Sequence, residues 1–471
     1  MMKLIKNPFL ILLLLALVAC STQINRSPAE FGSEYTYGAE LTFTNPRILE
    51  AQRALSSGTV NSEMSEDFQK QLIDRILHNC DECKLQRKVD KYGLEYGRIV
   101  YPDGWYFNVT LDPAVVEVTA KPIPDSKLAE YTKRLDRDLY ASAQEIGLRP
   151  SRNTGGGHIH FGADAFFEGN PDYFRDFMVD MYNHSEIGSG ILADDHYNSP
   201  PIKAHPAPNR NGFIEVINKY DQNPEGGIVG LGLEIREKAY NYQKANWGPT
   251  EKYQAINIER MVVEGFDASE ETVEIRCIRP QQSAEQFGLI ANLFKKRMNY
   301  LKRLRDSGTP VQFDHQTGMT GEQKFESFIR FITQADEDPA DYFRLLPAEY
   351  MDMAWEKLER LHPGNLEKKI AFIRHASNES PFDANLKARK AMDYLRRMRD
   401  SDPQFVLDRM EVVVEVFKNT DEKYRKPEKA QELLAEVEKF MNASALPKPS
   451  GFRATCDQII KSLSLPVFKA L

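Results

Sequence analysis

Four short segments of this chain share an alternation that limits how it can fold. Residues 35–43, 115–121, 158–163 and 272–278 each place apolar side chains at every second position. Because side chains alternate between the two faces of a β-strand, each segment predicts a strand with one apolar packing face. The opposite face of each carries a Glu, His or Arg near its centre. A single strand of this kind is ordinary, but four of them indicate a shared polar surface.

The polar positions of the four segments carry carboxylate, imidazole and guanidinium groups. They are Glu40, Glu117, His158, His160, Glu274 and Arg276. If the strands are neighbours in one antiparallel sheet, these side chains meet on one face and form a site. Carboxylate oxygens with a His nitrogen suit Mg²⁺ or Mn²⁺, and an arginine beside them suits phosphate oxygens. The pattern therefore predicts a divalent-metal site on this face.

Two loops are expected near this face. Gly155, Gly156 and Gly157 lead directly into His158, where glycines let backbone N–H groups approach an anion or nucleotide, or else form a tight turn. Residues 194–212 contain several prolines and asparagines and look too irregular for a helix. A long ordered loop of this kind is expected to be a lid or a substrate wall.

The chain divides into a mixed part and a helical part. Residues 287–304 carry one apolar stripe at spacings of three and four, which predicts a helix packed on the first, mixed domain. From Thr309 onward, including residues 405–417, nearly every segment has a helical period. The predicted fold class is α+β, an antiparallel sheet with helices behind it over residues 35–308, followed by an all-α domain over residues 309–471.

The first residues are expected to be a targeting segment. Lys3 and Lys6 precede an apolar run over residues 9–19, which is shorter than the ~20 residues of a spanning helix. The run ends in Leu-Val-Ala followed by Cys20, and this resembles the bacterial lipoprotein signal. The resemblance implies cleavage after residue 19 and lipid on Cys20. The polar residues that follow, with Pro28 and Gly32 among them, predict a tether over residues 20–34. Because Ser21 rather than aspartate follows, we expect a cell-envelope protein on the outer membrane, facing the periplasm or the exterior.

The net charge limits the classes of partner that the protein can bind, and the cysteine spacing limits the roles of its thiols. The formal net charge of −8 becomes −10 when the two leader lysines are removed, which disfavours binding to a nucleic acid backbone. In an oxidising compartment, Cys80 and Cys83 can close a small disulfide. A single CxxC without a second pair favours this structural role over zinc or redox chemistry.

The polar residues also lie in blocks that resemble the amidoligase family, the carboxylate–amine ligases related to glutamine synthetase and γ-glutamylcysteine ligase. Residues 38–42 resemble its Gly-x-Glu-x-Glu strand, with Thr42 in place of the second glutamate. Trp105, Asp112 and residues 117–122 resemble its second block. Residues 156–162 resemble its Gly-x-His-x-His strand, and residues 255–257 with 272–276 resemble its last block. The ordered set covers residues 35–305.

This resemblance implies a concave sheet face that binds ATP and a divalent metal. The implied reaction joins a carboxylate and an amine through an acyl phosphate, on a small-molecule or peptide substrate. Glu40, Glu117 and Glu274 would hold the metal, with His158 as a further ligand or a phosphate contact. Arg276 and His158 would be catalytic, and the nucleotide would be contacted by Gly155, Gly156, Gly157, His160 and Arg276. Because ATP is scarce outside the cytoplasm, two alternatives remain. One is a non-catalytic peptide- or cell-wall-binding lipoprotein, and the other is a metal-dependent amide hydrolase.

Overall fold

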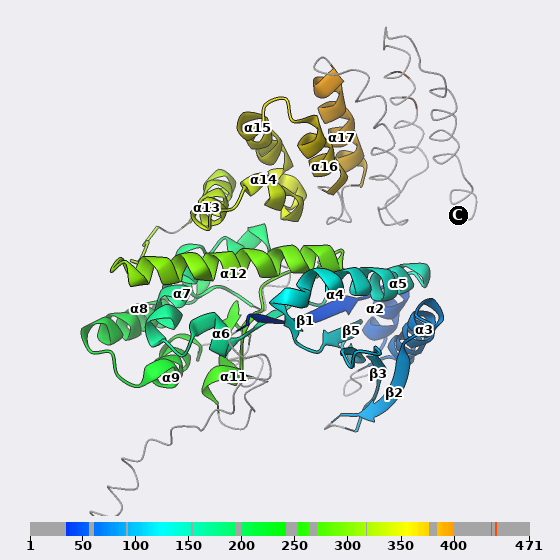
Figure 1. The fold of residues 1–471 in the computed structure, drawn as a ribbon, viewed down its shortest axis with the longest axis horizontal. Helices are drawn as coiled ribbons and strands as arrows, with labels where there is room; N and C mark the ends of the chain where they lie inside the picture. Colours follow the sequence, from blue (N-terminus) through cyan, green and yellow to red (C-terminus); the bar gives the residue numbers. More distant parts are fainter. Residues whose placement is uncertain are drawn as a thin grey trace, which may run out of the picture.

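The computed structural model describes residues 34–399, apart from 56–60, 91–92, 152–153, 194–198, 242–252, 264–270, 317 and 376–383, together with positions 435 and 439. The expected leader, Cys20 and the helical stretch at residues 405–417 lie outside the described residues. Figure 1 shows long helices running along one side of a sheet, and a series of shorter helices beyond α12. Within the described part of the chain, no helix is both long enough and apolar enough to cross a membrane.

One antiparallel sheet of nine strands organises the described residues. Its strand order is β2-β3-β4-β5-β1-β7-β9-β8, and β6 pairs with β1. The bounds are β1 Thr36–Phe43, β2 Lys84–Val89, β3 Glu95–Val100, β4 Tyr106–Asp112, β5 Val115–Ala120, β6 Ile123–Pro124, β7 Ile159–Gly162, β8 Ile256–Asn257 and β9 Thr272–Ile275. The four predicted strands are β1, β5, β7 and β9, and the structure confirms that they are consecutive neighbours, in the order β5-β1-β7-β9.

The apolar face of this sheet is buried under helices, as the alternation predicts. Tyr37, Ala39, Leu41 and Phe43 of β1 are at most 2 % exposed. The helices are α2 Pro46–Arg53, α3 Glu63–Asn79, α4 Leu128–Arg134, α5 Ala141–Glu145, α6 Ala163–Phe167, α7 Pro171–Asn183, α8 Ala207–Gln222, α9 Gly227–Ala239, α11 Glu259–Val262 and α12 Ala284–Asp306. Short helical turns are η1 Asp125–Lys127, η3 Ile187–Ile191 and η4 Ile202–Ala204, while the π-helical segment η2 Leu135–Tyr140 joins α4 to α5.

Two aromatic contacts show how these helices cover the sheet. Phe161 of β7 packs against Phe294 of α12, with ring centroids 5.9 Å apart. Phe43 of β1 meets Tyr140 of η2 edge to face at 5.2 Å. Burial of such large side chains contributes roughly 1.5–3 kcal/mol each. The apolar stripe of α12 therefore packs on the sheet, which confirms the expectation from its spacing.

The segment at residues 194–212 differs from its prediction. Residues 194–198 lie outside the described part, but α8 begins at Ala207, so the last residues of the expected irregular loop are helical. Pro206 precedes this helix and Pro208 lies in its first turn, where a missing N–H costs nothing. Prolines interrupt a helix in its interior, whereas these two stand at a helix start.

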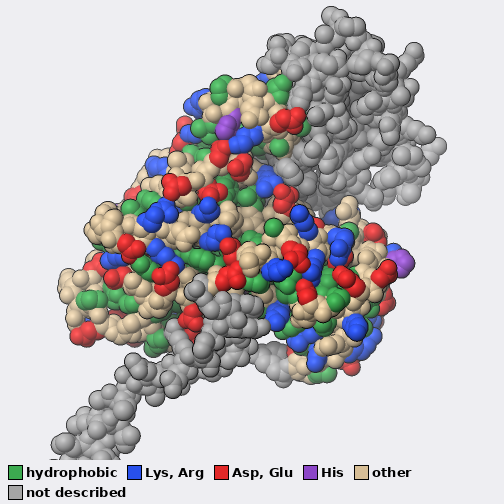
Figure 2. All heavy atoms as spheres, viewed as in Figure 1, with side chains coloured by type: hydrophobic (Ala, Val, Ile, Leu, Met, Phe, Trp, Pro, Cys, Tyr) green, Lys and Arg blue, Asp and Glu red, His purple; other side chains and the backbone are tan. Residues whose placement is uncertain are grey.

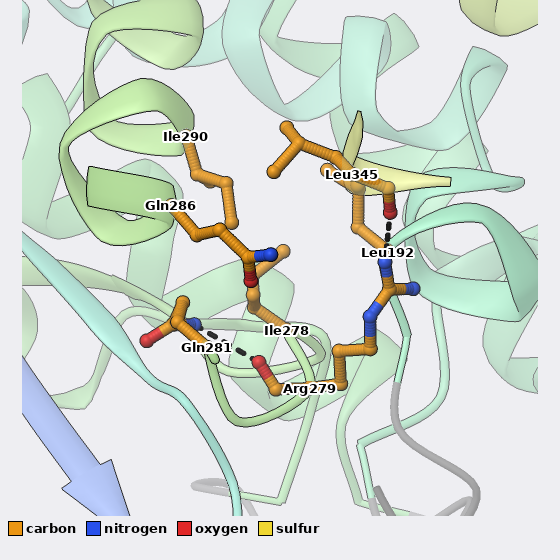
Figure 3. Close-up of a pocket in the computed structure, with 7 residues that line it drawn as sticks. All are labelled: Leu192, Ile278, Arg279, Gln281, Gln286, Ile290 and Leu345. Carbon is orange, nitrogen blue, oxygen red and sulfur yellow. Dashed lines mark hydrogen bonds between the residues drawn. The ribbon is translucent and has the colours of Figure 1, made fainter. Parts of the chain in front are cut away.

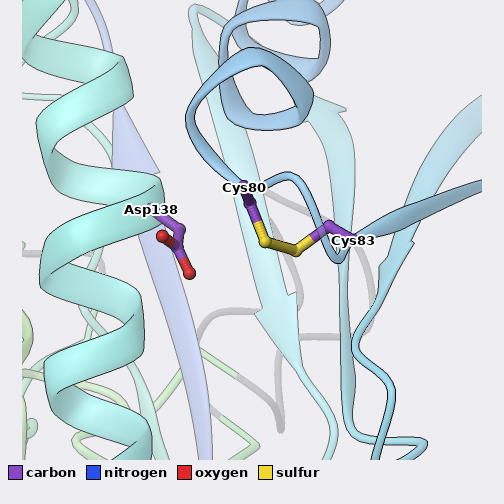
Figure 4. A group of neighbouring side chains, drawn as sticks. All are labelled: Cys80, Cys83 and Asp138. Carbon is purple, nitrogen blue, oxygen red and sulfur yellow. A yellow bond between two sulfur atoms is a disulfide. The ribbon is translucent and has the colours of Figure 1, made fainter.

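The Cys80 and Cys83 sulfur atoms form a disulfide, which the sequence allowed but did not decide. A carboxylate oxygen of Asp138 lies close enough to both cysteines to complete a set of metal-ligand types, and Figure 4 shows it beside the sulfur pair. Asp138 instead accepts hydrogen bonds from Tyr101 (2.6 Å) and Arg137 (2.6 and 2.7 Å). Because the sulfurs are bonded to each other, they offer no thiolates, and this group is structural.

The helices after α12 share the core of the sheet part. They are α13 Gly321–Gln334, α14 Pro339–Tyr342, α15 Met351–Leu361, α16 Leu366–His375 and α17 Ala384–Arg399, with turns η5 Phe343–Leu345 and η6 Ala348–Tyr350. One cluster of buried apolar residues extends from β1 as far as Met398 of α17. Arg297 of α12 also donates to the backbone oxygen of Phe331 in α13 at 3.1 Å. A domain boundary near residue 308 stays a prediction.

A small internal cavity lies between the end of β9, the start of α12 and η5. Figure 3 shows Arg279, Gln281, Ile278 and Leu345 around it. Its volume of about 10 Å³ is room for about one water molecule. None of the residues predicted for the polar site lines this cavity. It is therefore a packing defect at the base of the helices rather than a substrate pocket.

Candidate metal centre on the polar sheet face

The strand register brings the predicted polar residues to one place. Gly38 of β1 lies opposite His160 of β7, and His160 lies opposite Glu274 of β9. The N–H of Glu40 donates to the carbonyl oxygen of His158 at 3.0 Å, which extends the β1–β7 pairing by one step. Because directly opposed residues point to the same face, Glu40, His160 and Glu274 share the face away from the helices.

Glu40 lies between the two imidazoles. His158 Nδ1 is 2.8 Å from its Oε2, and His160 Nε2 is 2.9 Å from its Oε1. Burial alone would raise the pKa of this carboxyl, but the charge and hydrogen bonds of His160 and His158 outweigh burial and hold the pKa well below its ordinary value. Glu40 is therefore a carboxylate, ready to serve as a ligand.

Glu274 is the second carboxylate of the group and is only 4 % exposed. Its Oε1 lies 2.8 Å from Nη1 of Arg276 and 3.2 Å from Nδ1 of His158. Its Oε2 accepts a hydrogen bond from Nδ2 of Asn257 at 2.7 Å. Burial raises the pKa of Glu274, yet His160, His158 and Arg276 together lower it below the ordinary value.

His160 uses both ring nitrogens. Its Nδ1 is 3.0 Å from Oγ1 of Thr272, and its Nε2 contacts Glu40. Burial would lower the pKa of this imidazole, but Glu274 and Glu40 reverse the effect and raise it. The two carboxylates therefore favour the protonated form of His160.

Arg276 is largely buried beside these groups and is only partly satisfied. Its Nη1 binds Glu274, and its guanidinium lies 5.2 Å from the ring centroid of Tyr253. Its Nε is buried and has no hydrogen-bond partner among the described residues. Because such a donor is costly to leave unpaired, Arg276 is suited to receive an anionic ligand.

Glu117 lies on the same face but has a different environment. It stands opposite Thr42 in the register, and its carboxyl group has no hydrogen bond or ion pair to the rest of the described chain. Burial, followed by the charges of Glu40 and Asp112, raises the pKa of Glu117 to about 8. It is therefore protonated at neutral pH while Glu40 and Glu274 are ionised.

The residues that could hold a metal ion are Glu40, His160 and Glu274. One ligand atom of each lies within 4.8 Å of the others. His160 Nε2 is 2.9 Å from Glu40, close to the separation of about 3 Å between adjacent ligands of an octahedral ion with bonds near 2.1 Å. Its distance of 4.0 Å from Glu274 is nearer to the roughly 4.2 Å between opposite ligands of such an ion. The donor set fits a small divalent cation. Metal ligation by His158 and Glu117 stays a prediction.

The glycine turn packs closely around His158. A Cβ atom on Gly156 would lie 2.2 Å from His158 Nε2, and one on Gly157 would lie 2.4 Å from a backbone oxygen. The N–H of Gly157 donates to the oxygen of Ile278 at 2.9 Å, so it is not free to bind an anion. Thr42 stands where the family motif has its second glutamate. Its hydroxyl donates to the backbone oxygen of Gly156 at 2.8 Å, so this threonine has a structural role. Nucleotide contacts by Gly155 and Gly156 stay predictions.

Two partners of the site have no role in the sequence prediction. Asn257 orients Glu274, and Thr272 orients His160; such partners fix the geometry of metal ligands. Asn257 belongs to a block of the family resemblance and Thr272 begins a predicted strand, so the sequence contains a signal for each residue. Their contacts follow only from the pairing of β8 with β9 and of β7 with β9.

The comparison with protein-family models gives no match, and the comparison with curated proteins gives none either. The amidoligase resemblance therefore rests on the ordered motifs alone. What the chain can do has to be argued from the geometry of the polar face.

Proposed function

We propose that the polar face holds a divalent metal ion and that the protein is an ATP-dependent carboxylate–amine ligase. The observation that carries the proposal is the adjacency of β5, β1, β7 and β9, which gathers Glu40, His160 and Glu274 beside Arg276. The motif order supports the choice of reaction. Mg²⁺ or Mn²⁺ suits this mixture of carboxylate and imidazole donors.

The roles of the side chains follow from their contacts. Glu40, Glu274 and His160 would hold the ion, which when bound supplies positive charge to phosphate oxygens. Asn257 and Thr272 keep two of these ligands in place. Arg276 would offer to an anionic oxygen its Nε–H, which has no partner within the described part of the chain. These groups provide positioning and charge neutralisation, which is most of what phosphoryl transfer requires of a protein.

The proposed reaction has two steps. A substrate carboxylate oxygen attacks the γ-phosphorus of ATP, releasing ADP and forming an acyl phosphate. An amine then attacks the acyl carbon, phosphate leaves, and the amine loses a proton as the amide forms. His158, held between Glu40 and Glu274, is our candidate for handling that proton.

A metal-dependent amide hydrolase is the second candidate, favoured by Glu117. A carboxyl group with a pKa of about 8 beside a metal-compatible group is suited to general acid–base catalysis. This reaction needs no nucleotide, which agrees with the expected location in the cell envelope. A non-catalytic module that binds peptides or cell wall would use the metal only to hold its ligand.

Thermal unfolding with added ligands separates these functions. We expect Mg²⁺ or Mn²⁺ to raise the Tm of the wild type, and ATP to raise it further only when metal is present, because ligands stabilise the folded state that binds them. Glu274→Gln should abolish both shifts. Glu66→Gln, an exposed carboxylate of α3, is the matched control and should retain them.

A metal shift without an ATP shift would reject the ligase and favour the hydrolase or the binding module. Release of amine from an amide substrate would then identify the hydrolase. No metal shift in any variant would reject the metal centre itself.

A further inference from the structure

The polar face does not end at the metal-compatible group. Register pairs carry it outward, because Thr119 lies opposite Glu40 on one side and opposite Asn108 of β4 on the other. Asn108 in turn lies opposite Arg98 of β3, and Arg98 lies opposite Gln86 of β2. Opposed residues share a face, so one continuous surface runs from β1 to the edge of the sheet.

Side-chain hydrogen bonds follow the same path. Asn108 Nδ2 donates to Oγ1 of Thr119 at 3.3 Å, and Arg98 Nε donates to Oδ1 of Asn108 at 2.9 Å. The guanidinium of Arg98 also lies 3.9 Å from the ring centroid of Tyr106. Arg98 is thus held in one orientation, and its two terminal nitrogens have no partner within the described chain.

The outer end of this face is cationic. Lys84 and Lys88 of β2 lie two residues before and two residues after Gln86, so all three side chains point to the same face. Arg98, which lies opposite Gln86, shares this face. Both lysines are exposed, and among the described residues neither they nor Arg98 forms an ion pair. We call Lys84, Lys88 and Arg98 the cationic strip. Figure 2 shows Lys and Arg side chains interspersed with Asp and Glu side chains at the lower right of the molecule.

Packing explains why this face stays open. On the opposite face, Ile99 is fully buried, and a Cβ atom on Gly97 would collide with the side chains of Ile73 and Leu85. Helix α3, which holds Ile73, therefore covers that side of β2 and β3. The strip faces away from α3 and lies on the same side of the sheet as Glu40.

We propose that the cationic strip binds the acidic part of the substrate, and that the substrate is an extended peptide with several carboxylates. This inference rests on the proposed function, because it treats the strip and the metal centre as one surface. Four strand intervals separate β1 from β2, or roughly 19 Å. A single amino acid cannot reach both ends, whereas an acidic oligopeptide can.

Charge complementarity selects this ligand within a protein of net charge −8. The two terminal nitrogens of Arg98, which have no partner among the residues that the structure describes, can together bind one carboxylate, and the lysines supply further charge. An anionic membrane surface would also attract lysines. However, hydrogen-bonded side chains on the sheet face join Arg98 to Thr119, the register neighbour of Glu40. Lys84 lies at the end of β2 away from the β2–β3 turn.

The test measures peptide binding to the purified full-length protein by fluorescence anisotropy, with EDTA present. The probe is labelled hexaglutamate, with hexaglutamine as the uncharged peptide. We expect hexaglutamate to bind and hexaglutamine not to bind. The affinity for hexaglutamate should fall as the salt concentration increases. Arg98→Gln should weaken binding about tenfold, and Lys84→Gln with Lys88→Gln about three- to fivefold.

The matched control is Lys70→Gln with Lys133→Gln, which makes the same charge change on exposed positions of α3 and α4. This variant should bind hexaglutamate as the wild type does. Equal losses in the control and the strip variants, or no binding of hexaglutamate, would overturn the inference. So would strip-dependent binding to vesicles containing phosphatidylglycerol without binding to the peptide.

The metal and peptide results are independent. Metal stabilisation without peptide binding rejects the strip and leaves the proposed function intact. Strip-dependent peptide binding without any effect of metal supports the strip and rejects the ligase.

Discussion

Glu117 and Glu274 lie on one face of the sheet, yet replacing each by glutamine should change stability in opposite directions. Glu274 is paired with Arg276, Asn257 and His158, whereas burial and neighbouring carboxylates dominate the environment of Glu117. We expect Glu117→Gln to stabilise the metal-free protein at pH 8, because glutamine removes a carboxylate that the folded state disfavours. Glu274→Gln should cost about 3 kcal/mol, since it leaves buried donors without their acceptor.

The pH dependence of the free energy of unfolding gives the size of the effect expected from Glu117. Its pKa is about 8 in the folded protein, against an ordinary value of 4.5. The folded state therefore holds this proton more tightly, so Glu117 costs no stability below pH 4.5, and the cost grows as pH rises toward 8 and then levels off. Each pH unit in that window is worth about 1.4 kcal/mol, which gives a ceiling of about 4 kcal/mol between pH 5 and pH 8. Solvent contact reduces this to about 2–4 kcal/mol.

Urea unfolding of wild type and Glu117→Gln at pH 5, 6, 7 and 8, all with EDTA, measures this difference. The free energy of unfolding of the variant should exceed that of the wild type by an amount that increases steadily with pH. A difference that stays constant from pH 5 to pH 8, or a variant less stable at pH 8, would refute the reasoning.

Three further predictions concern the site and its anchor. Metal affinity should fall as pH decreases, approaching tenfold per unit once His160 is protonated, because the ion must displace its proton; isothermal titration at pH 6 and pH 8 checks this, and an unchanged affinity contradicts it. Gly156→Ala should push His158 away from Glu40, costing about 1–3 kcal/mol and weakening metal binding; a variant with wild-type Tm and affinity would show that the turn has room. Cys20→Ser should release the protein from membranes or block its processing, and cell fractionation would expose an error if attachment persisted.

The alternation of the four strands was enough to predict the polar face. Each strand buries one side, so a shift by one residue would bury Glu40 or Glu274 under the helices, and register is strongly specified in such strands. The apolar stripe of α12 was also predictable from the sequence. These features depend on local periodicity, which a single chain displays directly.

Other features depend on contacts between distant segments. The pairing of β7 with β9 sets His160, rather than His158, opposite Glu274. Strand β2 is exposed along nearly its whole length and has little apolar alternation, so no strong signal marks it. Its lysines become informative only when the register joins them to the site.

Direct Mn²⁺ binding is the measurement that tests the metal centre most simply. Electron paramagnetic resonance of free Mn²⁺, titrated with protein at pH 8, reports how much ion is bound. Wild type and the control Glu66→Gln should bind Mn²⁺ at a common affinity, while Glu40→Gln and Glu274→Gln should each lose most of it. Equal binding by all four proteins, or no binding by the wild type, would contradict the account.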